Sequence, residues 1–147
     1  DTTDLNVNQL RERLIQLFTD DRVEPMQISV VSFGFKYGLP LDVDNLFDVR
    51  FLPNPHWVPE LRDLTGLDES VRDYVLGQPE AGDFLERVDD LLAFLLPCYV
   101  KEGKSYMSFA VGCTGGQHRS VALAEELAQR IRAQGYGAGV FHRDIAR

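Results

Sequence analysis

Apolar residues along the chain recur at two kinds of spacing. Intervals of three and four predict a helix over residues 7–18, which Asn6 and Gln9 open with a capping-box pattern, and two later helices over 68–76 and 80–96. Pro97 is expected to end the helix over 80–96, because helical conformation is disfavoured for the residue before a proline. A further helix around residues 124–131 is predicted to end at Gly135.

Continuous apolar runs predict strands over residues 26–33, 47–52, 107–111 and 140–142. The segment 53–59 contains three prolines and is therefore predicted to be a shaped loop. Strands that alternate with helices, through connections too long for hairpins, favour an α/β fold. We expect a single layered domain over residues 25–147, with a largely parallel sheet and helices on its faces, after a linker and amino-terminal helix over residues 1–24.

The composition of the 147 residues is typical of one globular domain, with 44% apolar and 26% charged residues and no apolar run long enough to cross a bilayer. Two cysteines do not form a disulfide framework, which favours a reduced, cytoplasmic protein, and no metal-ligand spacing is present. The net charge of −8 argues against a domain whose main role is to bind a nucleic-acid backbone. Because the chain starts at Asp1 without a signal peptide, we expect it to be part of a longer protein.

The segment Gly112–Ser120, with the sequence GCTGGQHRS, lies between a predicted strand and a predicted helix. Gly115 and Gly116 allow the backbone to approach a ligand closely, so that backbone N–H groups and the helix N-terminus can bind an anion. Arg119 adds a forked cationic donor suited to phosphate. The other candidate binding residues of the segment are Cys113, Thr114, Gln117, His118 and Ser120. The alternative is a plain tight turn, with Arg119 solvated and Ser120 as the helix N-cap.

A second alternative for this segment is enzymatic. Cys113 and Arg119 satisfy the C-x5-R spacing of cysteine-dependent phosphatases, and Ser120 follows the arginine as it does in those enzymes. Such enzymes use a thiolate nucleophile and a separate aspartic acid. They usually carry histidine before the cysteine, where this chain has Gly112, and a small buried cysteine beside a turn explains the residue equally well.

Polar residues also follow the first two predicted strands. Asp48 and Arg50 share one strand face by two-residue alternation, and stiff prolines would hold Asn54 and His56 over a small polar ligand. The alternative is an internal Asp–Arg ion pair and a surface histidine. Lys36, between two glycines after the first strand, is a further candidate that could equally be an exposed turn residue. The basic pair at 142–143 is predicted to be a solvated end.

Three motifs together resemble the carboxy-terminal domain of the RapZ/YvcJ family, the RNase adapter proteins also called nucleotide-binding proteins. They read SFGFKYG, FDVRFLPNPHW with the following LRDLTGLD, and GCTGGQHRSVALAEELA, and the resemblance extends from about Gln27 to Asp144. It implies an α/β fold likened to a phosphofructokinase subdomain. It also implies an amino-terminal P-loop NTPase domain, absent from this chain, which alone would bind ATP or GTP, and a tetrameric full-length protein. In enterobacterial members this domain binds glucosamine-6-phosphate and a small RNA, which the adapter presents to an endonuclease, and the resemblance implies these ligands as expectations here.

The resemblance further implies that Asp48, Arg50 and His56, with Thr114, Gly115 and Arg119, surround a phosphosugar. The expected function is a metabolite-sensing regulatory domain with no catalytic residues and no cofactor of its own. The carboxylate of Asp48 would distinguish a cationic amino sugar from a neutral hexose phosphate. RNA and protein are both candidate macromolecular partners, and the acidic net charge, with no Lys/Arg-rich tail, favours protein. An RNA- or protein-binding scaffold without a small ligand is the remaining alternative.

Overall fold

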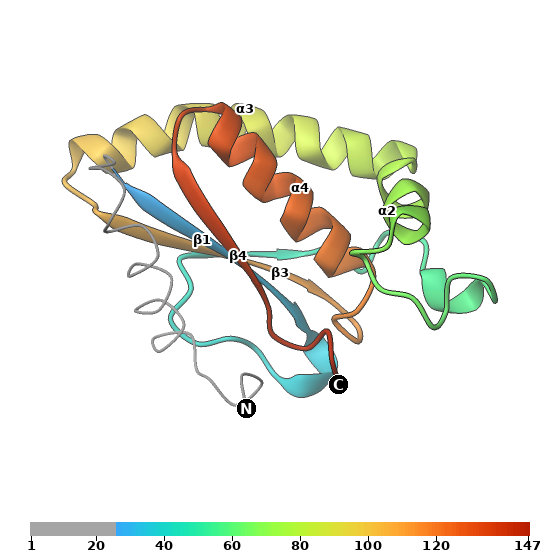
Figure 1. The fold of residues 1–147 in the computed structure, drawn as a ribbon. Coiled ribbons are helices and arrows are strands. Elements are labelled where there is room, and N and C mark those ends of the chain that lie inside the picture. The colour runs from blue at the N-terminus through green and yellow to red at the C-terminus, as the bar shows by residue number, and fades with distance from the viewer. Residues whose placement is uncertain (1–25) are drawn as a thin grey trace.

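A four-stranded parallel sheet forms the centre of the described residues, 26–147, in this computed structural model (Figure 1). The strands are β1 (Gln27–Gly34), β2 (Asn45–Asp48), β3 (Tyr106–Cys113) and β4 (Gly137–His142), in the spatial order β2-β3-β1-β4. This arrangement confirms the predicted α/β domain with a parallel sheet. The helix predicted over 7–18 and the linker lie outside the described residues.

The helices α2 (Glu69–Leu76), α3 (Pro79–Lys101) and α4 (Arg119–Ala133) lie on the same face of the sheet (Figure 1). The strand order explains this arrangement. The crossovers from β2 to β3 and from β3 to β4 step across the sheet in the same direction, so connections of one hand place their helices on one face. The link from β1 to β2 steps the opposite way and contains only the short 3₁₀ turn η2 (Phe35–Tyr37).

The hydrophobic core lies between the sheet and these helices. Alternate residues of the strands meet apolar residues spaced three and four apart on α3 and α4. The largest fully buried ones include Ile28, Val30, Met107, Phe109, Leu92, Leu96, Leu123, Leu127 and Ile131. Each such side chain stabilises the fold by about 1.5–3 kcal/mol relative to exposure, so α4 is firmly held along its length. Within the part of the chain that the structure describes, no helix is long and apolar enough to span a membrane.

The prediction that Pro97 ends its helix is wrong, because α3 continues to Lys101. A proline inside a helix leaves the carbonyl four residues earlier without its hydrogen-bond donor. That carbonyl belongs to Ala93, and both Ala93 and Pro97 lie on the exposed side of α3, where water can bind it. The buried residue Leu96 and the partly buried Tyr99 on the opposite side keep the helix packed past the proline.

The second strand is displaced from its predicted range of 47–52. β2 ends at Asp48, where it pairs with Gly112 of β3, and the chain then turns. Val49 and Leu52 are apolar, as strand residues often are, and both are buried in the core. They belong to a turn, however, in which the Leu52 N–H donates to the Val49 carbonyl oxygen. β3 and β4 begin earlier than predicted, and β3 also ends two residues later. The reason is that residues beyond the apolar run of each strand also pair with β1. The proline-rich loop contains a 3₁₀ turn, η3 (Pro55–Trp57).

Candidate functional site

The loops after β1, β2 and β3 meet at one edge of the sheet, because these parallel strands end in register. Gly34 of β1 pairs with Cys113 of β3, and Asp48 of β2 pairs with Gly112 beside it. A cavity of about 380 Å³ opens at this edge. It is lined by Lys36, Tyr37, Asn54, His56, Trp57, Cys113, Thr114, Gly115, Gln117, His118, Arg119 and Arg147. The carboxyl edge of a parallel sheet is the usual place for a ligand.

The cavity is cationic although the chain as a whole is acidic. Among the described residues that line it, none is Asp or Glu, while Lys36, Arg119 and Arg147 carry positive charge. The net charge of the chain is −8. A cavity that excludes carboxylates in such a protein favours an anionic ligand.

The glycines of the loop after β3 are required by close backbone contact. Gly116 has φ of 79°, and a Cβ atom there would lie 2.6 Å from the backbone nitrogen of Gly34. A Cβ atom on Gly34 would in turn lie 2.5 Å from the carbonyl carbon of Gly115. The loop after β3 therefore rests directly on the end of β1, and side chains larger than hydrogen would separate them. The Lys36 N–H also donates to the Thr114 carbonyl, at 3.1 Å.

Arg119, the first residue of α4, is a buried cation fixed by main-chain carbonyls. Arg119 is only 4% exposed. Its Nη1 atom donates to the carbonyl oxygens of Arg50 and Leu52, both at 2.9 Å. Nη2 makes a long contact of 3.4 Å with Thr114 Oγ1. Among the described residues, Nε has no hydrogen-bond partner and no carboxylate forms an ion pair with the guanidinium. A buried charge without a counterion is costly, so this arrangement is typical of a site that an anion completes.

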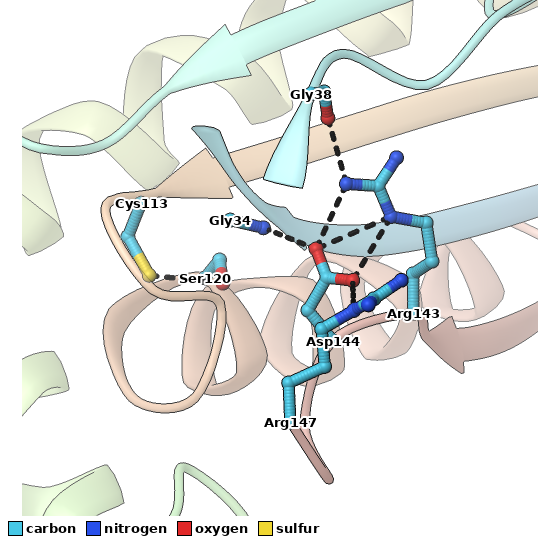
Figure 2. Close-up of polar contacts among 7 residues, drawn as sticks. All are labelled: Gly34, Gly38, Cys113, Ser120, Arg143, Asp144 and Arg147. Carbon is cyan, nitrogen blue, oxygen red and sulfur yellow. Dashed lines mark hydrogen bonds and ion pairs between the residues drawn. The ribbon is translucent and has the colours of Figure 1, made fainter. Parts of the chain in front are cut away.

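The alternative with a solvated Arg119 and Ser120 as N-cap is wrong. His118 is the N-cap residue of α4, and its Nε2 atom lies 3.1 Å from the Arg62 carbonyl oxygen. Ser120 is fully buried and accepts a hydrogen bond from the Cys113 thiol at 3.1 Å (Figure 2). The serine therefore holds the end of β3 against the start of α4.

Asp48 and Arg50 form an ion pair at the rim and do not line the cavity. The Arg50 Nη2 atom lies 2.7 Å from Asp48 Oδ2, and both side chains are nearly half exposed. The hydrogen bond from Arg50 lowers the pKa of Asp48 against the opposing effect of burial, and the charge of Arg119 contributes in the same direction. The Arg50 guanidinium also lies 3.8 Å from the centroid of the Phe35 ring. This segment reaches the site through the carbonyl oxygen that Arg119 binds.

The remaining sequence candidates fall into two groups. Lys36, Asn54 and His56 line the cavity, and the Asn54 side chain caps η3 by accepting the His56 N–H at 3.0 Å. Gly116 and Ser120 support the loop from behind without lining the cavity. The lining also contains Tyr37, Trp57 and Arg147, which were not among the candidates predicted from the sequence. Tyr37 and Trp57 stand inside the quoted motifs, whereas nothing in the sequence marked Arg147.

The predicted solvated basic end is also wrong. His142 Nδ1 lies 2.7 Å from Ser32 Oγ, and its Nε2 lies 2.6 Å from Glu125 Oε2. Arg143 is likewise mostly buried, in an ion pair with Asp144. No group of three or more His, Cys, Asp or Glu residues within 26–147 could hold a metal ion.

The parallel sheet and the cationic cavity at its carboxyl edge define a small α/β domain of the kind that places a ligand over strand ends. The family model described as the RapZ C-terminal domain matches residues 26–146, and the chain therefore belongs to that family.

Proteins named nucleotide-binding protein are similar to this chain along its whole length. The one from Parafrankia sp. (strain EAN1pec) is 54% identical over 147 residues, which are 100% of this chain and 51% of that protein. The one from Thermobifida fusca is 53% identical over 147 residues, 100% of this chain and 50% of that protein. The one from Bacillus cytotoxicus is 52% identical over 145 residues, 99% of this chain and 49% of that protein. The chain thus spans about half the length of these relatives.

Proposed function

We propose that this chain is a regulatory domain that binds a phosphorylated amino sugar, glucosamine-6-phosphate, and performs no catalysis itself. The observation that carries the proposal is the buried guanidinium of Arg119, whose Nη1 is anchored on two carbonyls while Nε has no partner among the described residues. A phosphate is a suitable anion for such a fork, because it accepts two parallel N–H donors and neutralises the charge.

The loop around Arg119 supports binding of a phosphate rather than of a simple halide. The loop from Thr114 to His118 leads directly into the N-terminus of α4, where backbone N–H groups have no helical partner. Thr114 and His118 are both part of the cavity lining. A volume of about 380 Å³ is within the range of small-molecule sites, which leaves room for a sugar beyond the phosphate.

The amino sugar is proposed on the charge of the rim. Asp48 is nearly half exposed and its pKa is lowered, so it is ionised at neutral pH. An ammonium group at the rim would gain from that carboxylate, whereas the hydroxyl of a neutral hexose phosphate would gain less. Because Arg50 already binds Asp48, this contribution to selectivity is expected to be modest.

The biological role is proposed as sensing. A ligand that binds one conformation of the domain better than another shifts the domain toward that conformation, and the ligand and a macromolecular partner then change each other's affinity by the same factor. We propose a protein partner first and RNA second, since the net charge of −8 opposes binding of a phosphate backbone. A cytoplasmic location, homo-oligomerisation of the whole protein, and ATP or GTP binding outside this domain belong to the same proposal.

A second candidate function is phosphatase chemistry at Cys113. It is favoured by the contact between Cys113 Sγ and Ser120 Oγ and by the position of Arg119 on the following helix. A phosphatase also needs an acid to protonate the leaving group. Asp48 is the aspartate at the rim, and its lowered pKa makes it a poor proton donor at neutral pH. We therefore place this function second.

Calorimetric titration of the chain separates these candidates. Glucosamine-6-phosphate, glucose-6-phosphate, glucosamine and inorganic phosphate are titrated into the wild type, Asp48→Asn and Cys113→Ser, with phosphate release measured in parallel. We expect tightest binding of glucosamine-6-phosphate without turnover, a smaller preference for it in Asp48→Asn, and retained binding in Cys113→Ser. Absence of binding by any sugar phosphate would contradict the proposal, and phosphate release that Cys113→Ser abolishes would establish the phosphatase.

A further inference from the structure

A buried carboxylate lies directly behind the cavity, at the carboxyl end of the chain. Asp144 is fully buried, and its Oδ2 atom accepts the N–H of Gly34 at 2.8 Å. The guanidinium of Arg143 binds the same carboxylate, with Nη2 at 2.9 Å from Oδ2, and Arg147 Nε binds Oδ1 at 2.9 Å (Figure 2). One carboxylate thus ties two arginines and the end of β1 together.

These contacts clamp the turn that forms one wall of the cavity. Arg143 Nη2 donates to the Gly38 carbonyl oxygen at 2.7 Å, while Asp144 holds Gly34 (Figure 2). Gly34 and Gly38 bracket the turn Phe35–Tyr37, whose residues Lys36 and Tyr37 line the cavity. The turn that carries Lys36 is therefore fixed at both ends by residues 143 and 144.

The same carboxylate lies against the glycine loop. A Cβ atom on Gly116 would lie 2.9 Å from the Cβ atom of Asp144. The side chain of Asp144 thus lies against Gly116 of the glycine loop and binds Gly34, which immediately precedes the turn that carries Lys36. A buried carboxylate that accepts several charge-assisted hydrogen bonds holds its partners in one geometry.

Arg147 is the cation that this arrangement places at the cavity. It is part of the lining, its side chain is 32% exposed, and its guanidinium lies 4.7 Å from the centroid of the Tyr37 ring. The Gln117 side chain donates a hydrogen bond to the Arg147 carbonyl oxygen at 3.0 Å. This bond joins Arg147 to the glycine loop. Asp144 forms ion pairs with both Arg143 and Arg147, so one buried carboxylate holds both guanidinium groups in place.

We propose that Arg147 is a further anion-binding residue of the cavity and that Asp144 is the residue that positions it, together with the turn that carries Lys36. The proposal deepens the proposed function and rests on it for the nature of the ligand. Arg119 then binds the anion from the buried side and Arg147 from the open side. Asp144 itself does not line the cavity and acts only through the residues it holds.

Titration with inorganic phosphate and with glucosamine-6-phosphate tests the role of Arg147. Arg147→Gln is expected to weaken binding of both probes by about tenfold, the effect of losing a charged hydrogen bond that is partly open to solvent. Arg87→Gln is the matched control, because it removes the same charge from an exposed site on α3 and is expected to leave affinity unchanged. Wild-type affinity in Arg147→Gln would overturn the proposal.

The positioning role of Asp144 is tested by a double-mutant cycle. Asp144→Asn is expected to weaken phosphate binding several-fold in the wild-type background and much less in the Arg147→Gln background, because the two residues act together. A purely structural role would give equal losses in both backgrounds, which would overturn positioning through Arg147. If Asp144→Asn fails to fold, Arg143→Gln loosens the same clamp, and wild-type phosphate affinity in that variant would overturn the positioning role.

The two probes keep this inference separate from the proposed function. If glucosamine-6-phosphate binds and Arg147→Gln leaves its affinity unchanged, the role of Arg147 is overturned and the amino-sugar site remains supported. Binding of inorganic phosphate that Arg147→Gln weakens, without any binding of glucosamine-6-phosphate, would support the role of Arg147 and contradict the amino-sugar site. Absence of binding by either probe would contradict both.

Discussion

Two of the arginines of helix α4, Arg119 at its amino end and Arg130 near its carboxyl end, have opposite surroundings. Arg130 near its carboxyl end forms ion pairs with Asp89 at 2.5 Å and with Glu126 at 2.9 Å, which raise the pKa of its guanidinium. Arg119 at the amino end is more deeply buried, and its partners within residues 26–147 are two carbonyl oxygens and a hydroxyl. Both residues are cations on one helix, so the difference lies in their partners. The paired charge of Arg130 is structural, whereas a buried charge such as that of Arg119, with no carboxylate ion-paired to it among the described residues, indicates a ligand site.

The geometry of the Arg119 fork can be separated from its charge. Arg119→Lys keeps the positive charge but cannot present two parallel N–H donors, so we expect affinity for glucosamine-6-phosphate to fall about tenfold to a hundredfold, or roughly 1.4–2.7 kcal/mol. Calorimetric titration measures this loss, with circular dichroism as a check of folding. An affinity equal to that of the wild type would mean that charge alone recruits the ligand.

Substitution of Gly116 tests whether the glycine loop packs directly against the end of β1. Gly116→Ala adds a Cβ atom at a φ of 79° and against the Gly34 nitrogen, so we expect unfolding free energy to fall by about 1–3 kcal/mol. Chemical denaturation measures the loss. Gly82→Ala on α3 is the control, since its Cβ would have no neighbour within 4 Å and a helical position favours alanine. Equal stability of the two variants would contradict the close approach of the loop to β1.

Replacement of Arg130 tests the structural half of the comparison. Arg130→Met removes a partly exposed cation from two carboxylates while keeping most of the apolar stem, so we expect a destabilisation of about 1 kcal/mol. Ligand affinity should stay that of the wild type, because Arg130 lies at the opposite end of α4 from the cavity. A large loss of affinity in this variant would show that helix stability, rather than the site, governs binding.

The smallest effect is expected from the ion pair at the rim. Its hydrogen bond from Arg50 lowers the pKa of Asp48 below its ordinary value of 3.8, so the pair stabilises the fold above that pH and loses its effect as the pH falls through the lower folded pKa. Asp48→Asn should therefore flatten the stability profile slightly on the acid side, below about pH 4. Thermal unfolding from about pH 3 to pH 7 measures the profile. An unchanged acid slope would contradict the lowered pKa.

The sequence predicted the parts of the site that depend on neighbouring residues. The glycine loop between β3 and α4 could be recognised because a strand, a group of glycines and the start of a helix follow one another in the sequence. Arg119 is the first residue of that helix. The ion pair of Asp48 and Arg50 was foreseen as one of two alternatives from their spacing. Arg147 was missed, because its place at the cavity depends on Asp144 reaching the end of β1, 110 residues away in sequence.

The helices and strands of the fold were predictable from the sequence, but their exact ends were not. The spacing of apolar residues located all three α-helices of the described residues, and continuous apolar runs located the strands. Both patterns depend on residues that are close together in the sequence. The ends of elements were set by contacts that the sequence does not show. β2 ends where it meets Gly112, and α3 passes Pro97 because its unpaired carbonyl faces water. These outcomes depend on which face of each element is buried.

The most direct test compares Arg119 and Arg130 of α4 as alanine variants. Arg119→Ala and Arg130→Ala are each titrated with glucosamine-6-phosphate, and their unfolding free energies are measured alongside. We predict that Arg119→Ala loses at least about a hundredfold in affinity, while Arg130→Ala binds as the wild type does but unfolds more easily. Equal affinities in the two variants, at measured and sufficient stability, would contradict the account that Arg119 is the anion-binding centre of this domain.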